Sequence, residues 1–429
     1  MKFLMTLFQI QDYGGIINHA EYLAKGLQEL GHEVDFCMLV PRTKIVERHQ
    51  PPKDLEQYRK VGTGYFFHQA RGWFGLPKVP YISRTARHNF KERCSKYDAV
   101  LWHIPVPTLS KDNAGVTQWL DLYDHGSKNI AIVHDGNLPE LYPHLNYVSQ
   151  HFHAAVCVHE SAMRSGEMLE IPRKLIVNPF DLTGLDGWTD FDRRKGFAAI
   201  QVFKAWKRVD TLIRAIPHME TKEPKFVGGA GIEYRYMTSE DKCKPKYYNE
   251  HGERIWDCAL RYGMTYMGTV PNDVVYQTLR EVKLQIDPSY SKKYSSYGAH
   301  FNRTTVEAMI CGAVPMATDW GMKGSAVFLP DVHYINIPAE CKPNVFADIV
   351  DNALTDKNQW LRIKEQNLER VRMFDMRAVA QEYVSLVHDN ALPRGLAMPI
   401  DKERCRKNLE FFGIMPSDAS SGGQTTLGV

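Results

Sequence analysis

Hydrophobic positions along the start of this chain follow first a strand pattern and then a helix pattern. Lys2–Gln9 reads as a short strand. After a glycine-containing loop, apolar residues recur at spacings of three and four, which predicts a helix that ends at Gly31. Residues 34–40 predict the next strand. The order strand, loop, helix, strand is a βαβ unit, so the chain is expected to begin a parallel α/β sheet.

The same alternation continues along the chain in two series. At 429 residues the chain is too long for one ordinary core, which indicates two domains. The first series predicts strands at 99–104, 130–133, 154–158 and 175–177. The second predicts strands at 198–203, 225–227, 265–267, 284–286 and 314–317, and helices at 210–216, 273–282 and 301–310. We expect domains at 1–178 and 196–374, a linker at 179–195, a C-terminal helical segment at 375–415 and a disordered tail at 416–429.

Composition narrows the class of protein. The chain is 44% hydrophobic and 24% charged, which is typical of a soluble globular protein. No apolar run reaches the roughly 20 residues of a membrane-spanning helix, so no membrane partner is expected. The first residues read as a strand rather than a signal peptide. The eight cysteines form no C-x-x-C pair and fit a reducing compartment, which predicts a cytoplasmic location.

Charge is distributed unevenly. Residues 42–96 contain 13 Lys/Arg and 4 Asp/Glu, which gives this segment a net charge of +9. Because the whole chain has a net charge of +3, the remaining residues have a net charge of −6. We interpret this basic block as an insertion with local helices. It also contains eight aromatic residues: Tyr58, Tyr65, Phe66, Phe67, Trp73, Phe74, Tyr81 and Phe90. Cations interleaved with aromatics suit a polyanion with stackable bases. An ordinary solvated surface is the alternative.

A helix followed at once by a strand is predicted around Glu307. Gly312 is suited to the left-handed position that ends a helix, and a short apolar strand follows it. A carboxylate on such a helix is expected near the crevice at the carboxyl ends of a parallel sheet, where open α/β folds bind ligands. A buried helix–strand unit with a solvated Glu307 is the alternative.

Two segments have features that suit phosphate groups. Gly14 and Gly15 lie between a strand and a helix N-terminus, where the helix dipole favours an anion, although a plain turn fits equally well. Lys204, Lys207 and Arg208 follow the first strand of the second series. Fixed cations there would stabilise the charge that builds on a departing diphosphate. A solvated basic turn is the alternative.

A histidine–aspartate pair ends another predicted strand. His134 and Asp135 follow the strand at 130–133, and His103 ends the strand before it. Histidine can orient groups or exchange protons near neutral pH, although it can also simply cap a strand. The histidines match no metal-site spacing. The D-x-D sequence at Asp190 and Asp192 lies in a polar linker, so we do not assign a metal to it.

Three further segments, Asn178–Asp181, Gly228–Gly231 and Tyr266–Val270, complete the set. Taken in order, these motifs resemble the retaining, two-Rossmann-domain (GT-B) glycosyltransferases of the large family-four type, over most of residues 1–390. The resemblance implies an α/β fold in which two Rossmann-like domains face each other across a cleft. The first domain would bind the acceptor and the second the nucleotide sugar. The C-terminal helix would return to the first domain, and Glu307 would hold the donor ribose.

The resemblance also implies roles for individual residues. Catalytic roles fall on His134, Asp135, Lys207 and Glu307. Donor contacts fall on Gly14, Gly15, Lys204, Arg208, Gly229, Gly231, Val270, His300, Asn302, Thr304 and Glu307. Two positions depart from the family pattern. Ala299 stands where the first glutamate of E-x7-E is expected, and Tyr297, His300 or Asn302 could replace it. Val202 stands where an arginine is usual.

The acceptor is suggested by a narrower similarity, to the phage DNA α-glucosyltransferases of the T-even type. Together with the basic block, it suggests a hydroxymethylated pyrimidine in duplex DNA, modified in the host cytoplasm. The acceptor residues would be Arg84, Arg87, Lys91, Arg93 and His103. A glycan or small-molecule acceptor is the alternative within the enzyme class, and a non-catalytic nucleotide-sugar or nucleic-acid binding protein is the alternative outside it. We expect a UDP-sugar co-substrate, no required cofactor, at most a non-essential divalent metal, and a monomer or weak dimer.

Overall fold

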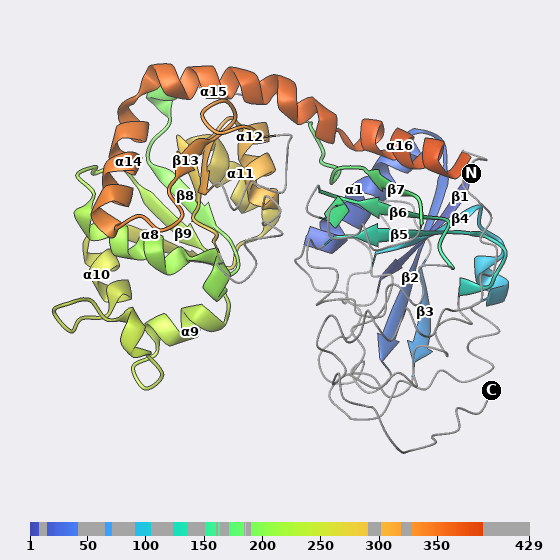
Figure 1. Ribbon diagram of the computed structural model, residues 1–429, viewed down its shortest axis with the longest axis horizontal. Coiled ribbons are helices and arrows are strands. Elements are labelled where there is room, and N and C mark those ends of the chain that lie inside the picture. The colour runs from blue at the N-terminus through green and yellow to red at the C-terminus, as the bar shows by residue number, and fades with distance from the viewer. Residues whose placement is uncertain are drawn as a thin grey trace, which may run out of the picture.

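The computed structural model contains two α/β units joined by a linker and a long C-terminal helical segment (Figure 1). It describes residues 1–7, 15–41, 65–70, 91–103, 123–134, 151–159, 162–163, 171–183, 185, 190–290, 302–318 and 328–388.

The N-terminal unit is built on a parallel sheet in the order β3-β2-β1-β4-β5-β6-β7. Its strands are β1 (Lys2–Leu7), β2 (Glu33–Pro41), β3 (Tyr65–Ala70), β4 (Ala99–Trp102), β5 (Lys128–Val133), β6 (Ala154–Cys157) and β7 (Arg173–Leu175). The order reverses direction between β1 and β4. Helix α1 (Gly15–Glu29) connects β1 to β2.

The C-terminal unit repeats this arrangement in the order β10-β9-β8-β11-β12-β13, again all parallel. Its strands are β8 (Phe197–Ile200), β9 (Lys225–Gly228), β10 (Met264–Gly268), β11 (Leu284–Asp287), β12 (Val314–Thr318) and β13 (Ile335–Ile337). Its helices are α8 (Val209–Ala215), α9 (Ile232–Thr238), α10 (Ile255–Arg261), α11 (Asn272–Glu281), α12 (Arg303–Cys311), α14 (Pro343–Thr355) and α15 (Lys357–Arg370). Both sheets have the strand order of a doubly wound Rossmann fold, so the predicted fold class is confirmed.

The hydrophobic pattern explains why these elements form. Strands β4, β8, β11 and β12 are buried along their whole length, because helices cover both faces of a parallel sheet. On α1 the apolar residues lie on one face. Ala20, Leu23, Ala24 and Leu27 are all fully buried, at the predicted spacings of three and four.

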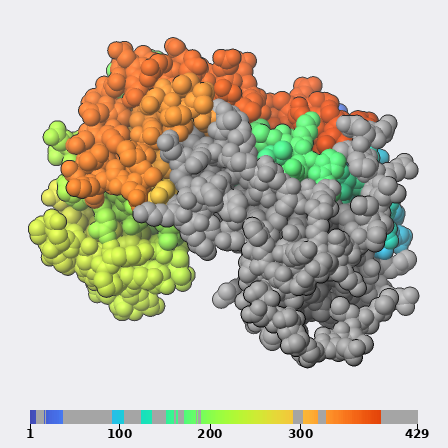
Figure 2. Space-filling model, viewed as in Figure 1, coloured from blue at the N-terminus to red at the C-terminus, as the bar shows by residue number. Residues whose placement is uncertain are grey.

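Helix α16 (Met376–His388) packs against α1, so the end of the described chain lies on the N-terminal unit. The two helices approach closely at Gly26, where a Cβ atom would lie 2.2 Å from the Met376 carbonyl oxygen. In Figures 1 and 2, α15 and α16 run as one band along the same edge of both units. The linker is bound to this band. Phe180 N–H donates to the Phe374 carbonyl oxygen at 2.7 Å, and Met376 N–H donates to the Phe180 carbonyl oxygen at 2.9 Å.

Several elements were not predicted from the sequence. Strand β3 lies within residues 42–96, where we expected an insertion with local helices, and it extends the sheet by pairing with β2. Strand β13 is also new. Helices α9, α10, α14 and α15 complete the second unit. Helix α15 is mostly polar and buries little more than Trp360, Ile363 and Asn367, so its hydrophobic pattern is weak.

Arg194, within the predicted linker, fastens two helices of the C-terminal unit together. Its buried guanidinium donates to the carbonyl oxygens of Leu279 and Val282 at 2.9 Å, at the end of α11. It also donates to the Cys311 carbonyl oxygen at 2.5 Å, at the end of α12. A cation among the free carbonyl groups of helix C-termini is favourable. Arg194 therefore helps to fix α12, the helix that contains Glu307.

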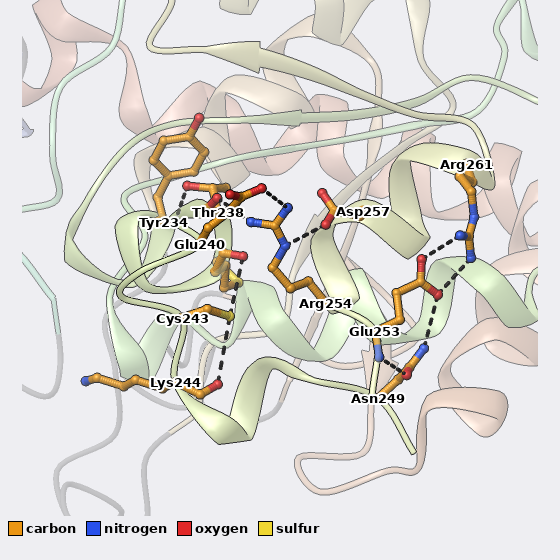
Figure 3. Close-up of polar contacts among 11 residues, drawn as sticks. Tyr234, Thr238, Glu240, Cys243, Lys244, Asn249, Glu253, Arg254, Asp257 and Arg261 are labelled. Atoms are coloured by element: carbon orange, nitrogen blue, oxygen red, sulfur yellow. Dashed lines mark hydrogen bonds and ion pairs between the residues drawn. The ribbon is translucent and has the colours of Figure 1, made fainter. Parts of the chain in front are cut away.

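Polar contacts also fix the segment between α9 and α10, as Figure 3 shows. The Arg254 guanidinium donates to the Thr238 carbonyl oxygen at 3.0 Å and pairs with Asp257 at 2.6 Å. Arg261 pairs with Glu253 at 2.7 Å. These contacts tie the end of α9 to α10. They thereby hold the aromatic side chains of both helices in place beside β10.

Candidate active site

Lys207 lies beside the point where the strand order of the C-terminal sheet reverses, between β8 and β11. Open α/β sheets bind ligands in the crevice outside such a point. A short 3-10 turn, Ala205–Lys207, follows β8 and directs the Lys207 side chain inward, where it is 6% exposed. Its Nζ donates to Asn302 Oδ1 and lies 4.1 Å from the centre of the Trp206 ring. Tyr290 N–H donates to the Trp206 carbonyl oxygen at 2.8 Å, which joins the loops after the two strands.

Asn302 connects Lys207 to a buried carboxylate. Its Nδ2 donates to Gln201 Oε1 at 3.2 Å and to Asp287 Oδ2. The other carboxylate oxygen, Asp287 Oδ1, accepts hydrogen bonds from the Ser289 N–H at 3.2 Å and from the Ser289 hydroxyl. Asp287 is the last residue of β11 and is 1% exposed. These side chains come from three separate segments and form one connected polar network.

The three predicted cations of this region differ in environment. The pKa of Lys207 is lowered to about 8, mainly by burial; the charge of Asp287 opposes this fall and that of Lys204 adds to it. Lys204 is exposed. Arg208 is half-buried, has left-handed backbone (φ 52°), and its Nε donates to Thr211 Oγ1 at 3.1 Å. Lys207 is therefore the best-enclosed cation of the three for a phosphate.

The loop after β9 passes very close to the loop after β8. Gly229 has a φ of +122°, and a Cβ atom there would lie 1.9 Å from the Gln201 carbonyl oxygen. At Gly231 a Cβ atom would lie 2.3 Å from the Phe203 carbonyl oxygen. Gly229 N–H donates to the Gly268 carbonyl oxygen at 2.7 Å. Glycine at these positions allows the two loops to pack this closely; the donor contacts predicted for Gly229 and Gly231 stay predictions.

We predict that Gly229→Ala destabilises the fold by about 3 kcal/mol, because it combines an unfavourable φ with a backbone clash. Urea unfolding measures the change. Gly252→Ala is the matched control, since Gly252 also has a positive φ (+74°) but no atom within 4 Å of an added Cβ. The control should cost about 1 kcal/mol, the cost of the backbone conformation alone. Equal losses in the two variants would contradict the close approach at Gly229.

Aromatic rings border the same loop. Tyr234 and Tyr266 stack with centroids 4.9 Å apart, and Trp256 lies 5.0 Å from Tyr266 in a T-shaped contact. The Tyr266 hydroxyl donates to the Gly229 carbonyl oxygen at 2.7 Å. Val270, at the end of this segment, packs against the hydrophobic cluster beneath β8. The stacked aromatic rings therefore border the glycine loop on one side.

Glu307 lies on α12 and is 4% exposed. Burial raises the pKa of its carboxyl group, while the charge of Arg303 opposes this rise. Arg303 Nε lies 3.9 Å from Glu307 Oε1. The Arg303 guanidinium also lies 4.1 Å from the ring centre of Phe180 and 5.5 Å from that of Tyr22 on α1. Helix α12 therefore meets the linker and the N-terminal unit at this point.

Thr304, which follows Arg303 on α12, is also a predicted donor contact. Thr304 Oγ1 is buried and has no hydrogen-bond partner within the part of the chain that the structure describes. The hydroxyl is thus available to a ligand that reaches α12.

Histidines gather at the carboxyl ends of the N-terminal strands. His103 Nδ1 and His134 Nε2 are 3.3 Å apart and share a hydrogen bond. The His19 ring, on α1, packs edge-on against both, with centroids 5.2 Å from His103 and 4.8 Å from His134. His159 Nε2 donates to the His134 carbonyl oxygen at 3.1 Å. The arrangement holds His134 at the end of β5, where the sequence predicted a functional histidine.

Burial keeps the inner histidines neutral. It lowers the pKa of His19 to about 3 and that of His103 well below its ordinary value. His19 Nδ1–H donates to Asn178 Oδ1 at 2.7 Å, and the Tyr383 hydroxyl lies 3.3 Å from His19 Nε2. His103 is fully buried and contacts His134 rather than the surface. Its role in acceptor binding stays a prediction.

The remaining predicted residues fall into two groups. Lys91 is paired with Asp124 at 3.2 Å, Arg93 is exposed, and Gly15 begins α1. Five others lie outside the described residues: Gly14, Arg84, Arg87, Asp135 and His300.

Sequence reasoning missed several residues of the site. Gln201, Asp287, Arg303 and His19 were not singled out. Asp287 carried a usable signal, because it is a charged residue directly after the apolar strand 284–286.

Within the described ranges, no group of three or more His, Cys, Asp or Glu side chains is placed to hold a metal ion. The D-x-D residue Asp192 instead pairs with Lys357 at 2.5 Å on the surface. No helix in the described part of the chain has both the length and the apolar character needed to cross a membrane.

No protein-family model and no curated protein matches the chain. Solved structures do match its fold. Anabaena Alr3699/HepE in complex with UDP has a TM-score of 0.64 at 15% identity, covering 90% of this chain and 99% of that chain. The pneumococcal O-GlcNAc transferase GtfA, in complex with UDP and GlcNAc, has a TM-score of 0.63 at 10% identity, covering 90% and 98%.

A third structure is an α-glucosyltransferase in complex with UDP-glucose and DNA containing an abasic site. Its TM-score is 0.60 at 12% identity, covering 90% of this chain and 99% of that chain. The two Rossmann-type units and these matches over nearly whole chains identify the fold as GT-B. At these identities the likeness extends to the fold alone.

Proposed function

We propose that the chain is a retaining glycosyltransferase that moves a sugar from a UDP-sugar to an acceptor hydroxyl. The observation that supports this most is the buried Lys207 network, placed where the order of the C-terminal sheet reverses. A cation there suits a diphosphate, and the glycines of the β9 loop let that loop pack closely against the loop after β8, at the edge of the same crevice. The matched HepE, GtfA and α-glucosyltransferase structures contain UDP or UDP-glucose, which supports the choice of donor.

In the proposed reaction the acceptor oxygen bonds to the anomeric carbon on the face from which the phosphate leaves. The bond between that carbon and the β-phosphate oxygen breaks, and the acceptor proton passes to the leaving phosphate, which gives UDP. Lys207 stabilises the charge on the departing diphosphate, with Lys204 and Arg208 nearby. His134, with Asp135, holds the acceptor and the sugar. The protein contributes positioning and electrostatics rather than a nucleophile.

Turnover of nucleotide sugars tests the proposal. The protein is incubated with a panel of nucleotide sugars, and release of the nucleotide is followed with and without acceptors. A UDP-sugar should be consumed and should also raise the unfolding temperature, because a ligand that binds the folded state stabilises it. Binding without turnover, in the presence of every acceptor class, would favour the non-catalytic alternative. No binding of any nucleotide sugar would contradict the proposal.

We predict that Glu307→Gln weakens donor binding by about 1–3 kcal/mol, the range for losing one hydrogen bond to a charged group. The reason is that Glu307 is proposed to accept hydrogen bonds from the ribose hydroxyls, and the amide accepts more weakly. Isothermal titration with UDP measures the change. Glu365→Gln, at an exposed position on α15, is the control. Unchanged UDP affinity and turnover in folded Glu307→Gln would reject the ribose assignment.

For the acceptor, we propose a hydroxymethylated pyrimidine in duplex DNA. Support comes from the balance of +9 over residues 42–96, with its aromatic residues, and from the fold shared with an α-glucosyltransferase that was crystallised with DNA. Three of those aromatics belong to β3, at the edge of the N-terminal sheet. A glycan or small-molecule acceptor is the competing choice. Stimulation of turnover by DNA, compared with sugars and small alcohols, separates the two.

A further inference from the structure

Lys207 is buried next to a carboxylate that does not contact it directly. Its Nζ is bound to Asn302 Oδ1, and the carboxylate of Asp287 is bound to Asn302 Nδ2. A direct ion pair would use N–H donors of the ammonium group and offset its charge at close range. Here the amide separates the two charges and takes one donor. The ammonium group therefore has two further N–H donors for a ligand.

The amide of Asn302 can be oriented in one way only. Its nitrogen faces two acceptors, Gln201 Oε1 and Asp287 Oδ2, and its oxygen faces the Lys207 donor. If the amide were rotated by 180°, its oxygen would lie against the two acceptor oxygens, and its NH2 group would lie against the Lys207 ammonium group. Asp287 is fixed in turn by Ser289, whose N–H and hydroxyl both donate to Oδ1. Hydrogen bonds thus fix the orientation of each side chain from Asp287, at the end of β11, to the Lys207 ammonium group.

We propose that Asp287, acting through the Asn302 amide, is a positioning residue that keeps the Lys207 ammonium charged and aimed at the donor diphosphate. The inference rests on the proposed function for its ligand. Burial alone would favour the neutral amine. Among the residues that the structure describes, the charged groups acting on Lys207 are Asp287, which favours its protonated form, and Lys204, which disfavours it. Asn302, Gln201 and Trp206 are neutral.

The first test needs no ligand. The full chain is labelled with 13Cε-lysine, and the Lys207 signal, identified by its loss in Lys207→Ala, is followed against pH. In the unsubstituted protein the midpoint is expected near 8, the value to which burial lowers the pKa of Lys207. In Asp287→Asn it should move down by about one pH unit, the lower end of the effect of a nearby opposite charge. Asn302→Ala should move it in the same direction, because the link is cut without removing the carboxylate.

Asp210→Asn is the matched control. Asp210 lies on α8, three positions after Lys207, yet its charge is not among those that act on Lys207. In this variant the Lys207 midpoint should equal that of the unsubstituted protein. If Asp287→Asn does not fold, Asn302→Ala decides the question. An unchanged Lys207 midpoint in whichever of these two variants folds would overturn the inference.

The second test uses UDP as the probe. UDP affinity should fall as pH rises through the Lys207 midpoint, because the protonated amine binds the diphosphate. In Asp287→Asn this fall should start about one pH unit lower, while affinity at acidic pH stays close to that of the unsubstituted protein. An equal loss at every pH would indicate a merely structural role and overturn the inference. If the midpoints shift in the ligand-free titration but neither the unsubstituted protein nor any variant binds UDP, the proposed function fails, while the coupling of Asp287 to Lys207 stands.

Discussion

Lys207→Ala should lower kcat by about 10²–10³, the effect of removing one preorganised donor that acts on charge in the transition state. The lysine is buried, held by Asn302 and close to the Trp206 ring, so its charge lies in a site where water screens it little. As the bond to the β-phosphate breaks, negative charge builds on the diphosphate, and the interaction with Lys207 strengthens. Steady-state kinetics with the active UDP-sugar measures kcat and KM separately.

Lys204→Ala is the comparison, because Lys204 is a cation of the same loop but is exposed. A solvated charge is screened, so its removal should change kcat by less than about tenfold. A Lys207→Ala variant that raises KM at unchanged kcat would show that the lysine binds the ground state and the transition state equally. That outcome would contradict the catalytic role proposed for Lys207. It would leave the nucleotide-binding proposal in place.

The sequence was most informative where one local signal determines the structure. The helix–glycine–strand around Glu307 was predicted because apolar spacing marks the helix and glycine ends it. The structure has α12 at Arg303–Cys311, Gly312 at a φ of +77°, and β12 at Val314–Thr318. The order of the two series likewise predicted two parallel sheets, because βαβ units connect in one hand only.

The sequence could not show contacts that depend on strand order. Lys207 and Asn302 are 95 positions apart, and they meet because β11 pairs with β8 across the sheet. Nothing in the spacing of the two residues indicates this. The same holds for His19 and Asn178, 159 positions apart, which α1 and the segment after β7 bring together. Strand β3 was missed for a different reason, because its short aromatic run lies within a strongly basic stretch.

Charge reversal in the basic block should abolish DNA binding and leave UDP binding intact. Two double variants are proposed, Arg84→Glu with Arg87→Glu and Lys91→Glu with Arg93→Glu. If these four cations contact phosphates, the affinity of the unsubstituted protein for duplex DNA should fall roughly 10²-fold between about 50 and about 200 mM salt, from counterion release. Each double variant should make this dependence shallower. UDP affinity should stay unchanged, because the four reversed cations are not among the proposed donor residues, most of which lie on the C-terminal unit.

Duplex DNA with hydroxymethylated pyrimidines, labelled and titrated at two salt concentrations, provides the measurement. The control reverses two exposed cations outside the block, Arg362 and Arg372, which should alter DNA binding much less. A general effect of net charge would weaken binding equally in the control and in the two double variants. That result would contradict the assignment of residues 42–96 as the DNA-binding surface. Micromolar or weaker binding with no salt dependence, or sugar transfer that proceeds equally without DNA, would contradict the DNA acceptor. In both cases the glycosyltransferase proposal would stand, because it rests on the Lys207 network and not on residues 42–96.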